Sequence, residues 1–216
     1  MQPILIIVLA TAASVPLGLW LRRDLATLSY RNADEVDLPE PGPRWWVVWT
    51  SVIVFGSLAG AAALSHSPLT YLALVPLAAS GPWLAAVDFD VHRIPNRMLL
   101  PASAATLLAV VGVGAAMQDW RTLVVALAAA TVAGAVLATV HYAAKGGVGF
   151  GDVKLAGAIA LAIGPLGVSS VWLSILAGSA AALIYAKVRS TIGLIPYGPW
   201  LLSGGWLASL STAFTS

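Results

Sequence analysis

The chain has no cysteine and few charged residues. Among its 216 residues, charged residues make up 9% and hydrophobic residues 59%, and the mean hydropathy is +0.89. The absence of cysteine excludes disulfides and thiolate metal sites, and it leaves the redox compartment undefined. The shortage of charge excludes a soluble globule, because a domain of this size needs more polar surface than the chain supplies. The composition therefore predicts an all-α, polytopic membrane protein.

Eight apolar segments follow one another along the chain, and most approach the length that a helix needs to cross the hydrocarbon core. They are 3–21, 45–64, 70–87, 98–117, 123–144, 153–166, 169–186 and 192–213. The stretch 153–186 is short for two crossings and is interrupted by Gly164-Pro165, so one tilted or kinked helix is an alternative there. We predict about eight transmembrane helices in a single domain that spans residues 1–216.

The basic residues predict the orientation of these helices. If the N-terminus and the C-terminus lie outside, every lysine and arginine except Arg121 falls on the cytoplasmic side. The first segment has no basic residue before it and is followed by Arg22-Arg23, which favours an uncleaved anchor over a secretory signal. Residues 22–44 are then expected to form an irregular cytoplasmic loop.

Two acids stand at the ends of apolar segments, where an ionised carboxylate is costly and indicates a functional site. Asp88 lies where the third segment ends, and Asp152 lies where the sixth begins. The predicted topology places both on the cytoplasmic face. Peptide hydrolysis by two carboxylates needs one ionised acid to activate a water and one protonated acid to polarise the carbonyl. The pair therefore favours an aspartyl protease that works at a membrane surface.

Each acid also has a structural explanation that stays open. Asp152 is also explained as a helix cap or as the partner of Lys154, and Asp88 as the partner of Arg93. If the two acids form a catalytic pair, helix polarity predicts that Asp152, at a helix start, begins as the base and that Asp88 begins as the acid. A coupled pair shares its protons, so this assignment need not be separable.

Three motifs occur in a fixed order around these acids. Asp88 stands six positions before Ile94-Pro95-Asn96, the run Gly149-Phe150-Gly151-Asp152-Val153-Lys154 follows, and Ile195-Pro196-Tyr197-Gly198-Pro199 stands in the last segment. Together they resemble the motifs of the prepilin peptidases, or type IV leader peptidases. The resemblance covers roughly residues 84–202.

This resemblance implies an intramembrane-type aspartyl protease, with Asp88 and Asp152 as the catalytic pair. Its client would be a prepilin or pseudopilin with a short basic leader, cut after a glycine on the cytoplasmic side of a bacterial inner (cytoplasmic) membrane. No cofactor and no metal are expected. Site-shaping or substrate-binding roles are expected for Gly149, Gly151, Lys154, Pro95, Asn96, Pro196, Gly198 and Pro199.

Asp90 competes with Asp88 for the first catalytic position. Residues two apart on a helix point to nearly opposite faces, so both cannot face Asp152, and the spacing to Ile94 favours Asp88. Bifunctional family members carry a cytoplasmic Cys-x-x-Cys insertion after the first helix and also N-methylate the mature pilin. Only the cysteine-free loop 22–44 stands there in this chain, so we expect leader removal without methylation and without zinc.

Two other functions stay open. An intramembrane protease of the presenilin or signal-peptide-peptidase kind shares the Gly-x-Gly-Asp loop, but it pairs that loop with a Tyr-Asp helix, whereas Val87 precedes Asp88 here. A non-enzymatic transporter subunit that uses buried acids for proton coupling predicts acids near the middle of the membrane. Both acids lie at segment ends instead.

Residues near the site carry two smaller predictions. The loop acids Asp34, Glu35, Asp37 and Glu40 are expected to form a cluster with few local cations. Such a cluster would attract a basic leader, although a solvated connector explains it equally well. His141 stands one turn before the glycines Gly146 and Gly147, and we expect it to contact an amide or carbonyl at the helix end.

Overall fold

The computed structural model describes residues 2–143, 148–189 and 195–214, and its regular structure is helical in that part of the chain. The α-helices are α1 (Gln2–Ala26), α2 (Trp46–Leu64), α3 (Val75–Val91), α4 (Asn96–Ala116), α5 (Trp120–Ala143), α6 (Phe150–Ile163), α7 (Val168–Arg189) and α8 (Gly198–Ser211). Short 3₁₀ helices are η1 (Ala33–Glu35), η2 (Pro68–Leu74), η3 (Gly164–Leu166) and η4 (Thr212–Phe214). The predicted all-α, polytopic membrane fold is confirmed.

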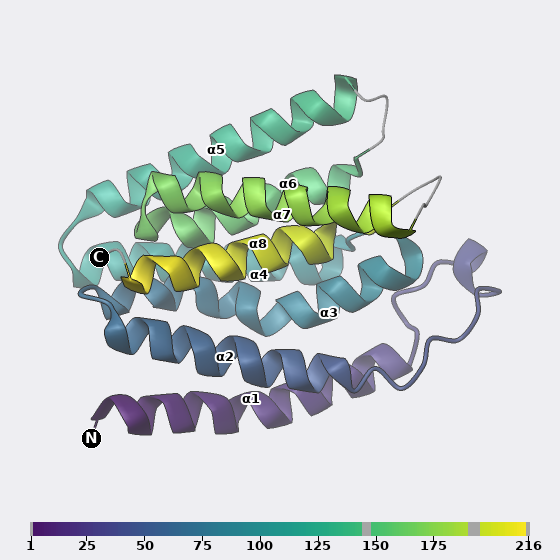
Figure 1. Ribbon diagram of the computed structural model, residues 1–216, viewed down its shortest axis with the longest axis horizontal. Coiled ribbons are helices and arrows are strands. Elements are labelled where there is room, and N and C mark those ends of the chain that lie inside the picture. The colour runs from purple at the N-terminus through teal and green to yellow at the C-terminus, as the bar shows by residue number, and fades with distance from the viewer. Residues whose placement is uncertain (1, 144–147, 190–194, 215–216) are drawn as a thin grey trace.

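Successive helices run in alternating directions along one bundle, as Figure 1 shows. Both termini lie at one end of this bundle. The loop between α1 and α2, the turn after α3, the end of α5 and the start of α8 lie at the other end. The three motif regions therefore meet at the loop end of the bundle, as the predicted alternation requires.

The helices differ in whether they are long enough to cross a membrane. Among the described residues, α1, η2 with α3, and α2, α4, α5 and α7 form six candidate spans by length and composition. Helices α6 and α8 have 14 residues each, which corresponds to about 21 Å, against about 30 Å of hydrocarbon. The count of eight crossings, like the sidedness of the termini, therefore stays a prediction.

Predicted segment 153–186 forms two helices, so the alternative of one kinked helix is wrong. Helices α6 and α7 run in opposite directions and are separated by η3 and by Gly167, whose φ of 119° lies in the region that favours glycine. Residues 144 and 192, at which two other predicted segments end or begin, lie outside the described residues. Lys145, Gly146 and Gly147 lie outside them as well.

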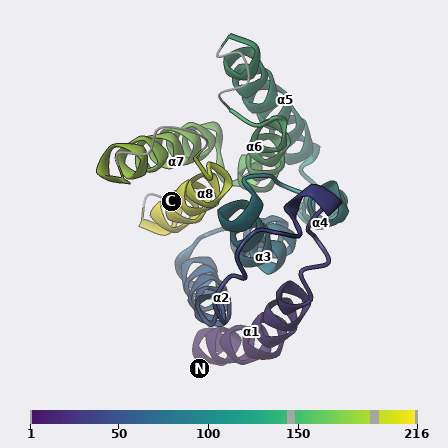
Figure 2. The same ribbon diagram turned by 90° about the vertical axis from the view of Figure 1, so that its right-hand side faces the viewer.

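The two helices that carry the predicted catalytic acids are the central ones. Viewed along the bundle in Figure 2, α3 and α6 lie in the middle, while α1, α5 and α7 lie at the periphery. Ten of the 17 residues of α3 and ten of the 14 residues of α6 are buried. By contrast, 17% of the most apolar window of α1 is buried, and the same holds for α5. The protein interior therefore encloses the acids, and the peripheral helices present apolar faces outward.

Local sequence explains where the helices at the site begin and end. Helix α3 ends because His92 adopts a left-handed conformation, with φ 50°, and because Pro95 disfavours helical geometry at the residue before it. Helix α8 begins at Gly198-Pro199, where the missing N–H of proline costs no helical hydrogen bond. These boundaries place Pro95 of the first motif just after the end of α3 and Gly198 of the third motif at the start of α8.

Candidate active site

Asp88 is a buried carboxylate in the last turn of α3. Only 3% of the residue is exposed. Its Oδ2 accepts a hydrogen bond of 2.9 Å from the backbone N–H of Gly198. Because Gly198 is the first residue of α8, the carboxylate faces the positive end of that helix. The last motif of the chain thus supplies a backbone donor to the first predicted catalytic acid.

Asp152 is a buried carboxylate in the first turn of α6, with 7% of the residue exposed. Its Oδ2 accepts a hydrogen bond of 3.2 Å from the backbone N–H of Gly149, so one oxygen caps the helix. Its Oδ1 is buried and has no hydrogen-bond partner among the described residues. The helix-cap explanation therefore holds for one oxygen of Asp152 and leaves the other available for chemistry.

Helix polarity does not distinguish the two acids. The prediction of Asp88 as the acid considered only its own helix, whose negative end lies nearby. In the folded chain the first amide of α8 faces Asp88, just as the start of α6 holds Asp152. The assignment of one acid and one base from helix polarity therefore loses its basis.

Ile94 brings the three motifs together. A Cβ placed on Gly151 would lie 3.1 Å from the Cβ of Ile94, and one placed on Gly198 would lie 2.9 Å from its Cδ1. Ile94 therefore fits between two glycines that have no side chain to displace it. Helices α3 and α6 are in contact, so the fold brings together the two helices that carry the acids.

Three further predicted residues connect the motifs or frame them. Lys154 donates a hydrogen bond of 3.1 Å from Nζ to Oδ1 of Asn96, so it does not serve as the predicted alternative partner of Asp152. Pro95 is buried and directly precedes α4. The first and second motifs of the site are thus joined by a polar contact as well as by packing.

The motif before α8 contains a residue that the sequence-based site omitted. The hydroxyl of Tyr197 forms a hydrogen bond of 2.6 Å with the hydroxyl of Ser179 in α7. Its neighbours Pro196 and Pro199 are buried. Tyr197 and Ile94 both lie within the sequence motifs, so their position along the chain could have identified them as site residues. Their contacts follow only from the fold.

Among the described residues, neither predicted catalytic acid has a cationic partner. In the part of the chain that the structure describes, no ion pair includes Asp88 or Asp152. The explanation of Asp88 as the partner of Arg93 fails, because Arg93 binds Glu35 through Nε and Nη2, each at 2.7 Å. A buried carboxylate without a cation is expensive, which is the usual mark of a functional residue rather than a structural one.

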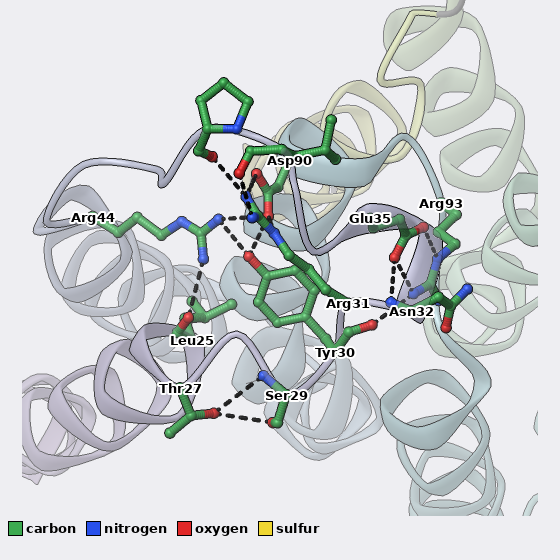
Figure 3. Close-up of polar contacts among 12 residues, drawn as sticks. Leu25, Thr27, Ser29, Tyr30, Arg31, Asn32, Glu35, Arg44, Asp90 and Arg93 are labelled. Atoms are coloured by element: carbon green, nitrogen blue, oxygen red, sulfur yellow. Dashed lines mark hydrogen bonds and ion pairs between the residues drawn. The ribbon is translucent and has the colours of Figure 1, made fainter.

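Asp90 points away from the site and into the loop between α1 and α2. It accepts hydrogen bonds from Arg31 and Tyr30 and forms an ion pair with Arg44, as Figure 3 shows. Its neighbour Asp88, two residues earlier on the same helix, contacts Gly198 instead. The two acids therefore belong to different contact networks.

The predicted acidic cluster with few local cations is wrong for Glu35. Hydrogen bonds from Arg93 hold the pKa of Glu35 below its usual value; burial opposes this, and the backbone N–H of Asn32 adds to it. The loop bends back onto the end of α3 instead of extending as an open connector. The remaining acids Asp34, Asp37 and Glu40 are exposed.

His141 has the carbonyl partner expected for it. Its Nδ1 lies 2.6 Å from the carbonyl oxygen of Val148, and its ring meets that of Phe150 edge to face. These contacts join the last turn of α5 to the start of α6. His141 thus supports the segment that carries Asp152, and this structural explanation is confirmed.

An apolar groove lies between the central helices of the bundle and extends toward the end of α3 and the start of α8. Its volume is about 410 Å³, and residues of α2, α3, α6 and α8 line it. It includes Phe89, the neighbour of Asp88, and Pro199, the neighbour of Gly198. A second cavity of about 450 Å³ lies beneath Pro41-Gly42-Pro43 and shares Phe89 and Trp46 with the groove. The groove therefore reaches the immediate sequence neighbours of Asp88 and Gly198, although neither acid lines it.

Comparison with protein-family models identifies one family. Residues 77–187 match the model of the type IV leader peptidase family, and this match includes α3, α6 and both acids. No curated protein and no solved structure matches the chain. Within the described residues, no group of three histidine, aspartate or glutamate side chains is arranged to hold a metal ion.

Proposed function

The chain belongs to the type IV leader peptidase family, and we propose that it is an aspartyl endopeptidase that removes the leader of prepilin-like or pseudopilin clients. The observation that carries this proposal is the pair of buried carboxylates on two different helices, without cationic partners among the described residues. Family membership indicates a peptidase, and two buried carboxylates are a chemistry that suits one. Asp88 and Asp152 are the proposed catalytic residues.

The proposed reaction uses one ionised and one protonated carboxyl group. The ionised group takes a proton from a water, whose oxygen adds to the carbonyl carbon of the scissile peptide. The protonated group donates its proton to the carbonyl oxygen. Collapse of the tetrahedral species breaks the C–N bond, and a proton passes to the departing amine. The free Oδ1 of Asp152 and the donor from Gly198 to Asp88 support this arrangement.

The groove supports a membrane-embedded client. An apolar helix lying between α2, α3 and α8 would bring its end to Phe89 and Pro199, the sequence neighbours of Asp88 and Gly198. A short polar leader that precedes such a helix would then leave the groove at the loop end of the bundle. In this proposal the cut follows a glycine, because a residue without a side chain lets the backbone approach both carboxyl groups.

The proposed sidedness follows from the basic residues. Arg22 and Arg23 near the end of α1, Arg93 and Arg97 after α3, and Lys187 at the end of α7 lie at helix ends that the bundle gathers beside the acids. The positive-inside rule then places the acids at the cytoplasmic face of the inner membrane, with both termini outside.

The proposal also covers the domain organisation and the N-methylation that bifunctional family members carry out. We treat residues 1–216 as one peptidase domain, in which the loop 22–44 stands where bifunctional family members carry a Cys-x-x-Cys insertion. Because this loop has no cysteine, we assign leader removal and no N-methylation.

A cleavage assay tests the proposal directly. The purified protein in detergent micelles is mixed with a synthetic client that has a short basic leader ending in glycine, followed by an apolar helix. Mass spectrometry of the products should show a single cut after that glycine, and Asp88→Asn and Asp152→Asn should each remove it. Absence of any cut by the wild-type protein would reject the proposal. Cutting by either variant at the wild-type rate would also reject it.

A further inference from the structure

One carboxylate on α3 holds both ends of the loop between α1 and α2. Asp90 lies 2.9 Å from Nη2 of Arg31 and 3.3 Å from Nη2 of Arg44, and it accepts a hydrogen bond from the hydroxyl of Tyr30. Arg44 also donates to that hydroxyl at 2.7 Å. The side chains of Arg31, Arg44 and Asp90 are 3%, 8% and 8% exposed. We call Tyr30, Arg31, Arg44 and Asp90 the loop clamp.

The loop clamp also orders the middle of the loop. Arg31 donates 2.8 Å hydrogen bonds to the carbonyl oxygens of Leu38 and Pro39, and Arg44 donates to the carbonyl oxygen of Leu25 at 3.3 Å. In Figure 3, Arg31 and Arg44 converge on Asp90 from two parts of the loop. The fold of the loop thus depends on one acid that belongs to α3.

A second attachment lies just beyond the end of α3. Arg93 donates two hydrogen bonds to the carboxylate of Glu35 in η1. It donates a third, of 2.6 Å, to the carbonyl oxygen of Tyr30. The left-handed residue His92 separates Arg93 from the helix. The loop therefore holds the chain on both sides of the point at which α3 ends.

Residues of the site and residues held by the loop alternate over this short stretch. Asp88 contacts Gly198, Asp90 contacts the loop clamp, Arg93 contacts Glu35, and Ile94 packs between Gly151 and Gly198. Any shift of the end of α3 that the loop now prevents would therefore move Asp88 and Ile94 together. Buried ion pairs add little net stability, and their best attested use is to specify one arrangement over others.

We propose that Asp90 is a positioning residue, which acts with Arg31, Arg44 and Tyr30 to fix the end of α3 so that Asp88 stays on the first amide of α8, beside Asp152. This inference rests on the proposed function of Asp88 and Asp152. It assigns to the loop a role in catalysis that does not require contact with the client. Asp90 takes no part in proton transfer.

Kinetics of Asp90→Asn in the full-length protein test this role. Loss of the carboxylate charge should lower kcat by about 10-fold to 100-fold, as a misplacement near 1 Å does, while KM stays near the wild-type value. The matched control is Asp37→Asn, which removes an exposed acid from the same loop and should leave kcat unchanged. A wild-type kcat in Asp90→Asn would overturn the proposal.

A second variant covers the case in which Asp90→Asn fails to accumulate. Arg44→Lys keeps the charge and loses the planar guanidinium that contacts Asp90, Tyr30 and Leu25 at once. It should give a smaller fall in kcat, again without a matching rise in KM. A rise in KM alone would show that the loop binds the client, and it would overturn the positioning role.

A distance measurement separates failure of this inference from failure of the proposed function. Spin labels on Phe89→Cys and Phe150→Cys report the separation of α3 from the start of α6; both side chains are partly exposed and the chain has no other cysteine. Asp90→Asn should broaden or shift the distance distribution, and Asp37→Asn should not. An unchanged distribution would overturn the clamp even if the protein cleaves its client, and a changed one supports it even if the wild type cleaves nothing.

Discussion

Asp88 and Asp90 lie in one turn of α3, and both side chains are buried, but their surroundings differ. Asp90 is matched by Arg31, Arg44 and the hydroxyl of Tyr30. Asp88 receives one backbone N–H, from Gly198, and no ion pair among the described residues includes it. Asp88 is a buried residue and Asp90 a half-buried one, yet the side chain of Asp90 is only 8% exposed, so the partners distinguish the two acids more than exposure does.

This difference separates a structural acid from a functional one. A carboxylate with two guanidinium groups is held in its charged form and in one place, so it can fix a loop but cannot exchange a proton. A carboxylate with few donors is poorly stabilised, and it is available to a water or a substrate. Asp152, whose Oδ1 has no hydrogen-bond partner among the described residues, belongs with Asp88 in this respect.

The largest expected effect is on catalysis by the unpaired acids. Asp88→Asn and Asp152→Asn should each lower kcat by about 10⁴-fold, because each removes a group that transfers a proton. The thermal midpoint of either variant should equal or exceed that of the wild type, since a buried carboxylate without a cation is replaced by a neutral amide. Cleavage kinetics and thermal unfolding in detergent measure the two quantities.

Asp90→Asn is the comparison variant for stability. It leaves two buried arginines without their counter-charge, so its free energy of unfolding should fall by about 3 kcal/mol. The comparison fails if Asp88→Asn is the destabilised variant and Asp90→Asn the stable one. It also fails if Asp90→Asn is as inactive as Asp88→Asn, because Asp90 would then be the catalytic acid.

The next effect concerns the glycine that serves Asp88. A Cβ on Gly198 would lie 3.1 Å from Oδ2 of Asp88 and 2.9 Å from Cδ1 of Ile94, so Gly198→Ala should displace the carboxylate and lower kcat by about 10-fold to 100-fold. Gly60→Ala in α2 is the matched control, because no atom lies within 4 Å of the added carbon. Equal kcat in the two alanine variants would show that the Gly198 contact does not matter to the reaction.

A smaller effect is expected at the attachment of Glu35 to Arg93. The pKa of Glu35 is lowered in the folded loop, so its contribution to stability is complete above about pH 5 and is lost as the pH falls through the lowered pKa. Hydrogen exchange of the backbone around η1 should therefore speed up on acidification, and Glu35→Gln should remove that pH dependence. Exchange that responds to acid equally in wild type and variant would place the titrating group elsewhere.

The last prediction concerns topology rather than stability or activity. It tests on which side of the membrane the acids and the loop between α1 and α2 lie. Single cysteines at Ser67 and Gln118 should react with an impermeant reagent added outside, whereas a cysteine at Ala33 in the clamped loop should not. Reaction of Ala33 from outside would reverse the predicted orientation and overturn the helix count.

Much of the architecture was predictable because hydrophobic length is a local property. Apolar runs predicted the helices that the structure contains, but not all of their bounds: the last segment was predicted to begin at residue 192, whereas α8 begins at Gly198. The number of crossings was less predictable, since α6 and α8, at 14 residues, are shorter than the hydrocarbon is thick.

The sequence by itself determined the membrane class, the three motifs and the choice of Asp88 and Asp152 as the acids to test, because each depends on residue type and order along the chain. Only the tertiary structure decided the contacts among them. Gly198 lies far from Asp88 in sequence yet donates to it, and Arg93, expected beside Asp88, binds Glu35 instead. The loop that looked like an open acidic connector is held by Asp90, since the partners of a charged side chain depend on which helix ends the fold brings together.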